Sequence, residues 1–261
     1  MADLMLSTPS GSAPSISDHA QPGDAQLRKG FGPRVRRLHA RIGKAHHQAE
    51  GMVFSQALLN GKASPRQLAA LMRALAPAYA LLEQEAPALA MALGGLEIPW
   101  QALARSTALR HDIAVFGALP PTPVSVAAAE WLEHLELLCR QAPHRLMAHV
   151  YVRYGGDLSG GQQLGQKANA ILAAQGLPAL SFWTFDSPIE QLKQGLHDGF
   201  EAMDLSEQEE AELLEEAEVA FLLTQRLLAE LGGVTGPDPD TDRAMGQAAS
   251  QAAGQVTVAG G

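Results

Sequence analysis

The chain has 261 residues, of which 46% are apolar and 18% are charged, and this apolar content excludes a mainly disordered protein. Its formal net charge of −9 argues against a dedicated nucleic-acid binder, which needs a basic excess to neutralise phosphates. A single cysteine, Cys139, excludes a disulfide framework and a cysteine-rich zinc or iron–sulfur site. We find neither an apolar run of membrane-spanning length nor a signal peptide, so we expect a cytoplasmic protein.

Three stretches of the chain differ in composition. Residues 1–30 are rich in Ser, Pro, Gly and Ala without periodicity, which predicts a flexible leader. Residues 31–232 carry helical signals throughout, and residues 233–261 return to Gly, Ala, Gln and Ser, which predicts a disordered tail. We therefore expect one folded domain between two flexible ends.

Helix starts can be read from capping residues. The expected caps are Ser64, Ser125, Ser187 and Ser206. Pro77 is expected to kink or restart the helix that follows Ser64, and Gly232 with Gly233 is expected to stop the last helix. No stretch alternates apolar and polar residues over the length of a strand, so the predicted fold class is all-α.

Charge is unevenly distributed along the domain. Basic side chains concentrate in its first part, at Arg34, Arg36, Arg37, Arg41, Lys44, Lys62, Arg66 and Arg73. From Glu201 to Glu218 the charged residues are acidic, which predicts a solvated helix face. The basic part is expected to attract an acidic partner or an anionic ligand.

Four glycines interrupt a helical pattern: Gly155, Gly156, Gly160 and Gly161. Each glycine inside a helix costs about 1 kcal/mol relative to alanine, so this segment must need a bare or bent main chain. Gly156 and Gly160 are one helical turn apart and would share a face, where a flat ligand could approach the backbone. A plain glycine loop between two helices is the alternative that the pattern leaves open.

The segment from Tyr151 to Gln162 (YVRYGGDLSGGQ) closely resembles the distal-helix signature of haem oxygenases. The segment KAHHQAE, which ends at Glu50, resembles the proximal-histidine segment of that family, and YALLEQE, which begins at Tyr79, resembles its next helix. Residues 103–112, 182–185 and 221–224 match later landmarks in order. The resemblance covers residues 33–231 and implies a single-domain helical bundle with a kinked, glycine-rich distal helix.

The activity that the resemblance implies is that of a haem-degrading monooxygenase, an oxidoreductase. Haem would be both cofactor and substrate, and dioxygen would open it to biliverdin, carbon monoxide and ferrous iron. Electrons would come from a ferredoxin, a flavodoxin or a reductase, because the chain carries no nucleotide-binding fingerprint. An acidic donor could dock on the basic part of the chain, and a phytochrome could accept the bilin. We expect neither a nucleic-acid nor a membrane partner.

Two adjacent histidines, His46 and His47, offer the neutral imidazole that suits haem iron. The residues that share a predicted helix face with His46 favour it modestly over His47 as an iron ligand. The resemblance assigns His46 as the axial ligand. Glu50, one turn further on, could orient the imidazole through its second nitrogen. The resemblance assigns a water-mediated proton relay to Asp157, with Arg153 and Tyr79 in the hydrogen-bond network.

The resemblance places further residues around the haem: Tyr151, Gly156, Gly160, Lys193, His39, His197, Phe221 and Thr224. His39 and His197 stand where the family usually has Lys or Arg. Because histidine is only partly charged near neutrality, we expect weaker or pH-dependent clamping of the haem propionates. Thr224 stands where an asparagine is common, and it keeps one hydroxyl for the water network.

Two other functions remain open from the sequence. The altered propionate anchors and Thr224 would suit a non-degrading haem carrier or sensor, although the presence of Asp157 and Gly160 argues against one. A non-haem di-iron oxygenase would need paired carboxylates and Glu-x-x-His sets. The acidic cluster Glu130, Glu133, His134 and Glu136 contains no such set, and we interpret it as a solvated helix face.

Overall fold

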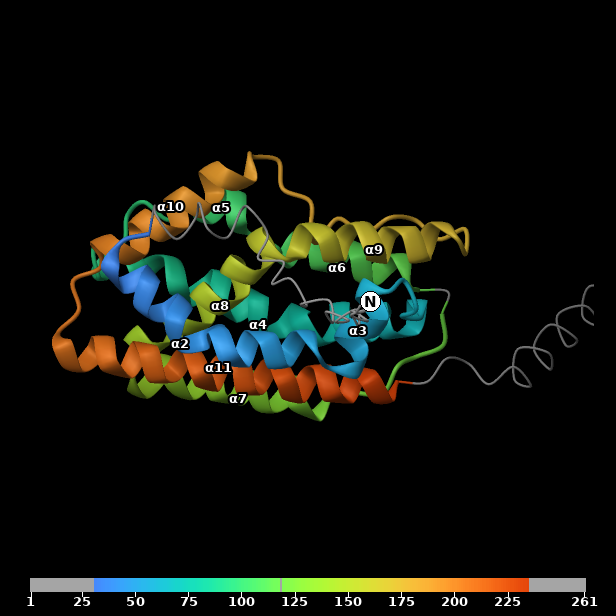
Figure 1. Cartoon of the computed structure of the whole chain (residues 1–261), viewed down its shortest axis with the longest axis horizontal. Coiled ribbons are helices and arrows are strands. Elements are labelled where there is room, and N and C mark those ends of the chain that lie inside the picture. The colour runs from blue at the N-terminus through green and yellow to red at the C-terminus, as the bar shows by residue number, and fades with distance from the viewer. Residues whose placement is uncertain (1–30, 118, 235–261) are drawn as a thin grey trace, which may run out of the picture. The chain divides into compact units, whose positions relative to one another are not determined.

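The computed structural model describes residues 31–117 and 119–234. The predicted leader and the part of the predicted tail beyond residue 234 lie outside the described residues. Every regular element in the described residues is helical and none is a strand, which confirms the all-α prediction (Figure 1).

The α-helices in chain order are α2 (Pro33–Glu50), α3 (Val53–Leu59), α4 (Pro65–Ala92), α5 (Trp100–Leu103), α6 (Ser106–Val115), α7 (Val126–Gln141), α8 (Leu146–Ser159), α9 (Gly161–Ala173), α10 (Ile189–Ala202) and α11 (Glu207–Gly233). A short 3₁₀ turn, η1 (Pro143–Arg145), joins α7 to α8. Among these helices, none combines the length and the apolar character that crossing a bilayer requires.

The long helix α11 organises the packing. It packs against α2, α7 and α8, and α2 and α7 run alongside it in Figure 1. The helix α4 packs against α6, α7 and α8, so α8 contacts both of the long helices α4 and α11. Fully buried side chains of the core include Val35, Leu38, Leu68, Leu82, Leu135 and Leu213. This apolar core holds α8, the helix with the glycine segment, in the interior of the fold.

Three of the four predicted caps are present. The hydroxyls of Ser64, Ser125 and Ser206 each accept the main-chain N–H three residues later and so satisfy a donor that the helix leaves unpaired. The prediction for Ser187 is wrong, because α10 begins at Ile189 and its N-cap residue is Pro188. The last helix ends at Gly233, as the paired glycines predict.

The helix α4 continues through Pro77 and does not restart there. Proline lacks an N–H and removes one bond from the helical ladder. The neighbours Ala74, Ala78 and Tyr79 are buried against other helices, and this packing holds the two halves of α4 in one element.

The basic and acidic stretches of the sequence meet in the fold. Arg37 of α2 forms an ion pair with Glu210 of α11, and Arg41 forms one with Glu218. Arg34 is buried and donates to main-chain carbonyls at the end of α10. The interpretation of the acidic run as a purely solvated face is therefore wrong, because part of it binds α2.

Candidate functional site

A carboxylate, a phenol and a guanidinium meet where α4 packs on α8. The hydroxyl of Tyr79 donates a short hydrogen bond to Oδ2 of Asp157. The Nε–H of Arg153 donates to the same hydroxyl oxygen at 3.3 Å. Tyr79 is 0% and Asp157 is 4% exposed, so both lie in the protein interior, while Arg153 is partly exposed. The structure thus brings together the three residues that the sequence links to proton transfer.

Burial shifts the titration of this trio. Desolvation raises the pKa of Asp157, although the charge of Arg153 and the hydrogen bond from Tyr79 oppose the rise. Desolvation also raises the pKa of Tyr79 well above its usual value. Burial disfavours the charge on Arg153, but Tyr79 and Asp157 outweigh it and raise the pKa of the guanidinium. Arg153 therefore stays charged and Tyr79 stays a donor, while the pKa of Asp157 is raised above its usual value.

A second set of hydrogen bonds lies beside the trio, where the ring of Tyr154 contacts that of Tyr79, and it involves residues to which the sequence analysis gave no role. The hydroxyl of Tyr154 donates to Glu83 at 3.3 Å, and Glu83 also accepts the main-chain N–H of Ser106 at 3.0 Å. The guanidinium of Arg105 donates to main-chain carbonyls before α10. Two signals in the sequence could have found Glu83, because it lies in the segment YALLEQE that carries the resemblance and one helical turn after Tyr79, on the same face.

His46 lies on α2 beside α11. Its ring packs edge-on against Phe221, with 5.9 Å between ring centroids. Its Nδ1 lies 3.7 Å from a carboxylate oxygen of Glu50, and its side chain is 53% exposed. His47 is 91% exposed. Contact with a second helix therefore distinguishes His46 from His47.

The four glycines of the distal segment serve two purposes. A Cβ added to Gly155, Gly156 or Gly160 would meet no atom within 4 Å, so the main chain there is bare and faces open space. A Cβ on Gly161 would lie 2.8 Å from Cδ1 of Trp183, so that glycine is required by packing. The helix α8 ends one residue before Gly160 and α9 begins one residue after it. This break confirms the kinked distal helix.

The predicted propionate anchors lie on α8, α10 and α2, which pack together. The ring of Tyr151 lies 6.5 Å from that of His197. Burial, with a contribution from the charge of Lys193, lowers the pKa of His197 to about 4, so this histidine is uncharged at neutral pH. Lys193 pairs with Glu190 at 3.2 Å, and His39 is exposed on α2. Lys193 is accordingly the one lysine among the predicted propionate anchors.

Thr224 uses its hydroxyl proton within its own helix. Its Oγ1 donates to the carbonyl oxygen of Ala220 at 2.9 Å. A hydroxyl carries only one proton, so Thr224 can accept a hydrogen bond from a water but is already committed as a donor.

A second buried polar cluster was not predicted. Glu216 is 1% exposed and accepts hydrogen bonds from His134 at 2.6 Å and from His149 at 3.0 Å. The indole N–H of Trp131 donates to Nδ1 of His149 at 3.2 Å. The interpretation of the helix around His134 as a solvated face is therefore wrong at His134 itself, whose ring nitrogen reaches into the core.

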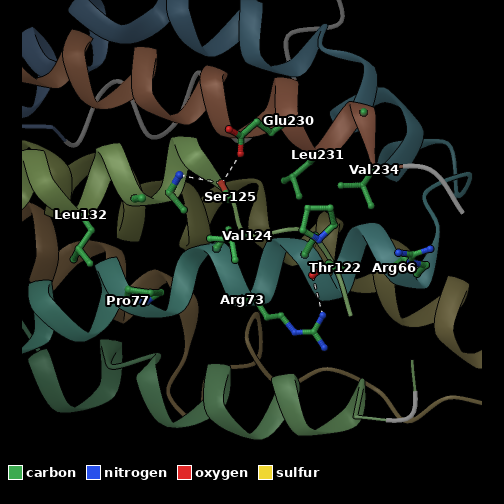
Figure 2. A pocket seen from close by; sticks show the side chains of 16 residues that line it. Arg66, Arg73, Pro77, Thr122, Val124, Ser125, Leu132, Glu230, Leu231 and Val234 are labelled. Carbon is green, nitrogen blue, oxygen red and sulfur yellow. Dashed lines mark hydrogen bonds between the residues drawn. The ribbon is translucent and has the colours of Figure 1, made fainter. Parts of the chain in front are cut away.

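A hollow of about 660 Å³ lies between α4, α7 and the end of α11 (Figure 2). None of the described residues that line it is a His, Cys, Met or Tyr, the usual protein ligands of haem iron. Its carboxylate, Glu230, is engaged by the hydroxyl of Ser125 and the N–H of Ala127, and Figure 2 shows Ser125 directed at it. This hollow is therefore not the haem site that the sequence predicts.

Comparison with known proteins decides the family. The family described as "Heme oxygenase" matches residues 35–230, which is most of the chain. This chain belongs to the haem oxygenase family. The haem oxygenase is similar to "Heme oxygenase 1" of Pongo abelii, at 31% identity over 206 residues that cover 72% of this chain and 68% of the relative. It is also 29% identical to "Heme oxygenase 1" of Gallus gallus over 217 residues, or 77% and 71% of the two chains.

Solved structures agree with this assignment. The haem oxygenase superposes on heme oxygenase from Leptospira interrogans with a TM-score of 0.68 at 27% identity, covering 76% of this chain and 100% of that chain. Heme oxygenase-1 from the cyanobacterium Synechocystis sp. PCC 6803, solved in complex with heme, gives a TM-score of 0.70 at 22% identity and covers 85% and 99% of the two chains. At that identity the second comparison supports the fold alone.

Proposed function

We propose that this haem oxygenase binds haem between α2 and α8, with His46 as the axial ligand of the iron and the bare main chain of Gly156 and Gly160 on the opposite side. The residues present fit haem. The imidazole of His46 is half-exposed and offers a nitrogen ligand, and the space over both glycines is open. The observation that carries the proposal is the buried hydrogen bond between Tyr79 of α4 and Asp157 of α8, the helix that bears Gly156.

When bound, haem supplies the iron centre at which dioxygen reacts and the porphyrin that is opened to biliverdin, carbon monoxide and ferrous iron. On the α2 side, the carboxylate of Glu50 lies 3.7 Å from Nδ1 of both His46 and His47 and would have to approach Nδ1 of His46 to orient its ring, while Phe221 restricts the plane of that ring. On the α8 side, the absence of side chains at Gly156 and Gly160 lets a flat ligand lie against the main chain.

Asp157 holds and moves the proton in this proposal. Tyr79 donates to Oδ2, so Oδ1 is the oxygen that exchanges a proton with a water. The raised pKa of Asp157, caused first by desolvation, suits a carboxyl group that must both carry and release a proton. Arg153 holds the phenol of Tyr79 in place through a hydrogen bond. Its positive charge also limits the rise in the pKa of Asp157.

Lys193 and Tyr151 are the side chains proposed to bind the haem propionates. Lys193 supplies an ammonium group that can donate charge-assisted hydrogen bonds to a carboxylate, and burial raises the pKa of Tyr151 so that its hydroxyl remains a donor. His197 is neutral and can contribute only a hydrogen bond. We propose that the haem is therefore anchored by one cation on α10.

An acidic electron donor is proposed to dock on exposed basic side chains of α2 and of the segment that joins α3 to α4. Arg36, Lys44 and Lys62 are exposed, and none of them forms an ion pair with another described residue. Turnover with an acidic ferredoxin or flavodoxin is expected to fall several-fold when ionic strength rises, because exposed charges are screened. A turnover rate independent of salt would exclude this docking surface. The cytoplasm is the proposed compartment, and a phytochrome the proposed acceptor of the biliverdin.

The activity is tested by incubating the purified chain with hemin, oxygen and either ascorbate or a ferredoxin with its reductase. The expected result is loss of the Soret band together with release of biliverdin and carbon monoxide. The neutral His197 and the internally bonded Thr224 favour, as a second candidate, a haem carrier. A Soret band that persists without biliverdin would support that carrier and overturn the oxygenase.

A further inference from the structure

The guanidinium of Arg153 lies over two aromatic rings. Its central carbon is 5.6 Å from the ring centroid of Tyr79 and 5.6 Å from that of Trp131. Tyr79 belongs to α4 and Trp131 to α7, so three helices converge on this one cation. The faces of aromatic rings attract a guanidinium, and Trp attracts it most strongly. Trp131 is 4% exposed, so the contact is shielded from solvent.

The orientation of the indole is itself fixed. Its N–H donates to Nδ1 of His149 at 3.2 Å. An indole nitrogen can only donate, so Nδ1 must be the acceptor and the proton of a neutral His149 must sit on Nε2. That Nε2 lies 3.0 Å from a carboxylate oxygen of Glu216 and donates to it. Burial lowers the pKa of His149, in keeping with a neutral ring.

The same cluster has the donor set of a metal site. Ligand atoms of His134, His149 and Glu216 all lie within 4.8 Å of one another. A metal at this point would need the lone pair of Nε2 on His149, and the proton would then move to Nδ1, where it would face the N–H of Trp131. Two donors cannot share a hydrogen bond. The geometry therefore favours hydrogen-bonded support of Trp131 over metal binding.

We propose that Trp131 is a positioning residue for the proton relay of this haem oxygenase. The indole holds Arg153 against Tyr79, and the pair His149–Glu216 holds the indole. This inference rests on the proposed role of Asp157, and it gives the unpredicted buried cluster a function in the reaction.

The proposal has a consequence for Asp157 that can be measured without haem. The charged and titratable groups that interact with its carboxyl are Tyr79 from α4, Arg153 and Tyr154 from α8, and Arg105 from the start of α6. The positive charge of Arg153 opposes the effect of desolvation on the pKa of Asp157. If the guanidinium is no longer held beside Tyr79, its charge opposes the effect of desolvation on Asp157 less strongly. Loss of the indole is therefore expected to raise the pKa of Asp157 further.

The test is a pH titration of the haem-free protein by NMR, with ¹³C in the side-chain carboxyls of aspartate and the Asp157 signal assigned by its loss in Asp157→Asn. In Trp131→Leu the pKa of Asp157 is expected to rise by roughly half a unit or more. Trp131→Phe keeps an aromatic face and is expected to show a smaller rise. Phe116→Leu removes a fully buried aromatic ring and is expected to leave the Asp157 titration unchanged.

The same variants are then loaded with haem. Trp131→Leu is expected to lower kcat about tenfold with little change in haem affinity, because the relay and not the binding surface is disturbed. A folded Trp131→Leu with an unchanged pKa for Asp157 overturns the proposal.

If Trp131→Leu does not fold, two variants of His149 test the proposal instead. His149→Gln keeps an acceptor for the indole and a donor for Glu216, whereas His149→Leu keeps neither. A raised pKa for Asp157 in His149→Leu alone supports the proposal, and equal titrations in both variants overturn it. The proposed relay is tested separately, because it is excluded if Asp157→Asn forms biliverdin normally, and the oxygenase activity itself is tested by biliverdin release from the wild type. If the pKa of Asp157 is unchanged in the Trp131 and His149 variants but the relay through Asp157 is supported, only the proposed role of Trp131 is excluded.

Discussion

The assignment of the iron ligand depends on one pair of neighbouring residues. His46→Ala is expected to weaken haem binding roughly tenfold or more, because the variant loses the axial nitrogen and its contact with Phe221. His47→Ala is the matched control, since His47 is 91% exposed, and its haem affinity should equal that of the wild type. Absorbance titration with hemin measures both. Equal losses in the two variants would contradict the assignment of His46.

Asp157 separates reactivity from binding. Asp157→Asn removes the proton carrier, so biliverdin formation is expected to fall about a hundredfold while haem still binds. Because burial raises the pKa of Asp157 in the fold, its ionised form costs stability above that pKa, and the melting temperature of Asp157→Asn at pH 8 should not be lower than that of the wild type. The exposed Asp204, changed to Asn, is the control. Normal biliverdin yield from Asp157→Asn would exclude the relay.

Single residues also show which parts of the candidate site could be predicted from the sequence. Tyr79, Arg153 and Asp157 could be predicted because a specific motif and its resemblance name them. Glu215 and Glu216 could not be told apart, because both lie in the same acidic run. Only the packing of α11 on α8 shows that Glu216 is buried while Glu215 is exposed.

At the scale of the helix, Gly156 makes α8 less stable than an alanine at the same position would. Replacing that glycine by alanine is expected to raise the free energy of unfolding by about 0.5–1 kcal/mol, because the residue is helical and a Cβ meets nothing within 4 Å. The added methyl would occupy the space proposed for haem, so haem affinity should fall several-fold. Gly155→Ala is the control. It gains the same stability and points elsewhere around the helix, so it should keep haem binding.

Urea denaturation and hemin titration measure the two effects of that substitution. If Gly156→Ala and Gly155→Ala are stabilised equally and bind haem equally, the bare face at Gly156 is not the haem surface. If neither is stabilised, the glycines are required by the main chain itself.

Helix ends were predictable where the signal is local. Ser64, Ser125 and Ser206 cap their helices through hydrogen bonds that span three residues. The contact between α2 and α11, by contrast, joins Arg41 to Glu218 across most of the domain. No local pattern encodes that pairing, so the basic and acidic stretches could be read only as separate surfaces.

For the whole molecule, the net charge of −9 conceals an ordered arrangement. Much of the basic excess of α2 is matched by acids of α11, and Arg36, Lys44 and Lys62 remain exposed. Inside the fold, Glu216 joins α11 to three other elements through His134 of α7, Arg145 of η1 and His149 of α8. Charge therefore contributes to the assembly of the bundle as well as to its surface.

The acid stability of the whole fold is expected to depend on Glu216. Burial alone would raise the pKa of this carboxyl, but hydrogen bonds from His149 and His134 lower it from 4.5 to about 2. A pKa depressed in the fold contributes stability that is present above pH 4.5 and is lost as pH falls towards 2. The size is on the order of 3 kcal/mol, because each pKa unit is worth about 1.4 kcal/mol.

Glu216→Gln should therefore lower the free energy of unfolding at pH 7 by an amount of that order, and the difference from wild type should shrink as pH falls through the window below 4.5. His149, whose pKa is lowered from 6.5, adds a separate loss of stability that begins at higher pH. The exposed neighbour Glu215, changed to Gln, retains both contributions and should follow the wild-type curve. Urea denaturation over this pH range measures all three proteins. A constant difference between Glu216→Gln and the wild type at every pH would show that the loss comes from packing, and that the ionised carboxylate does not hold the helices together.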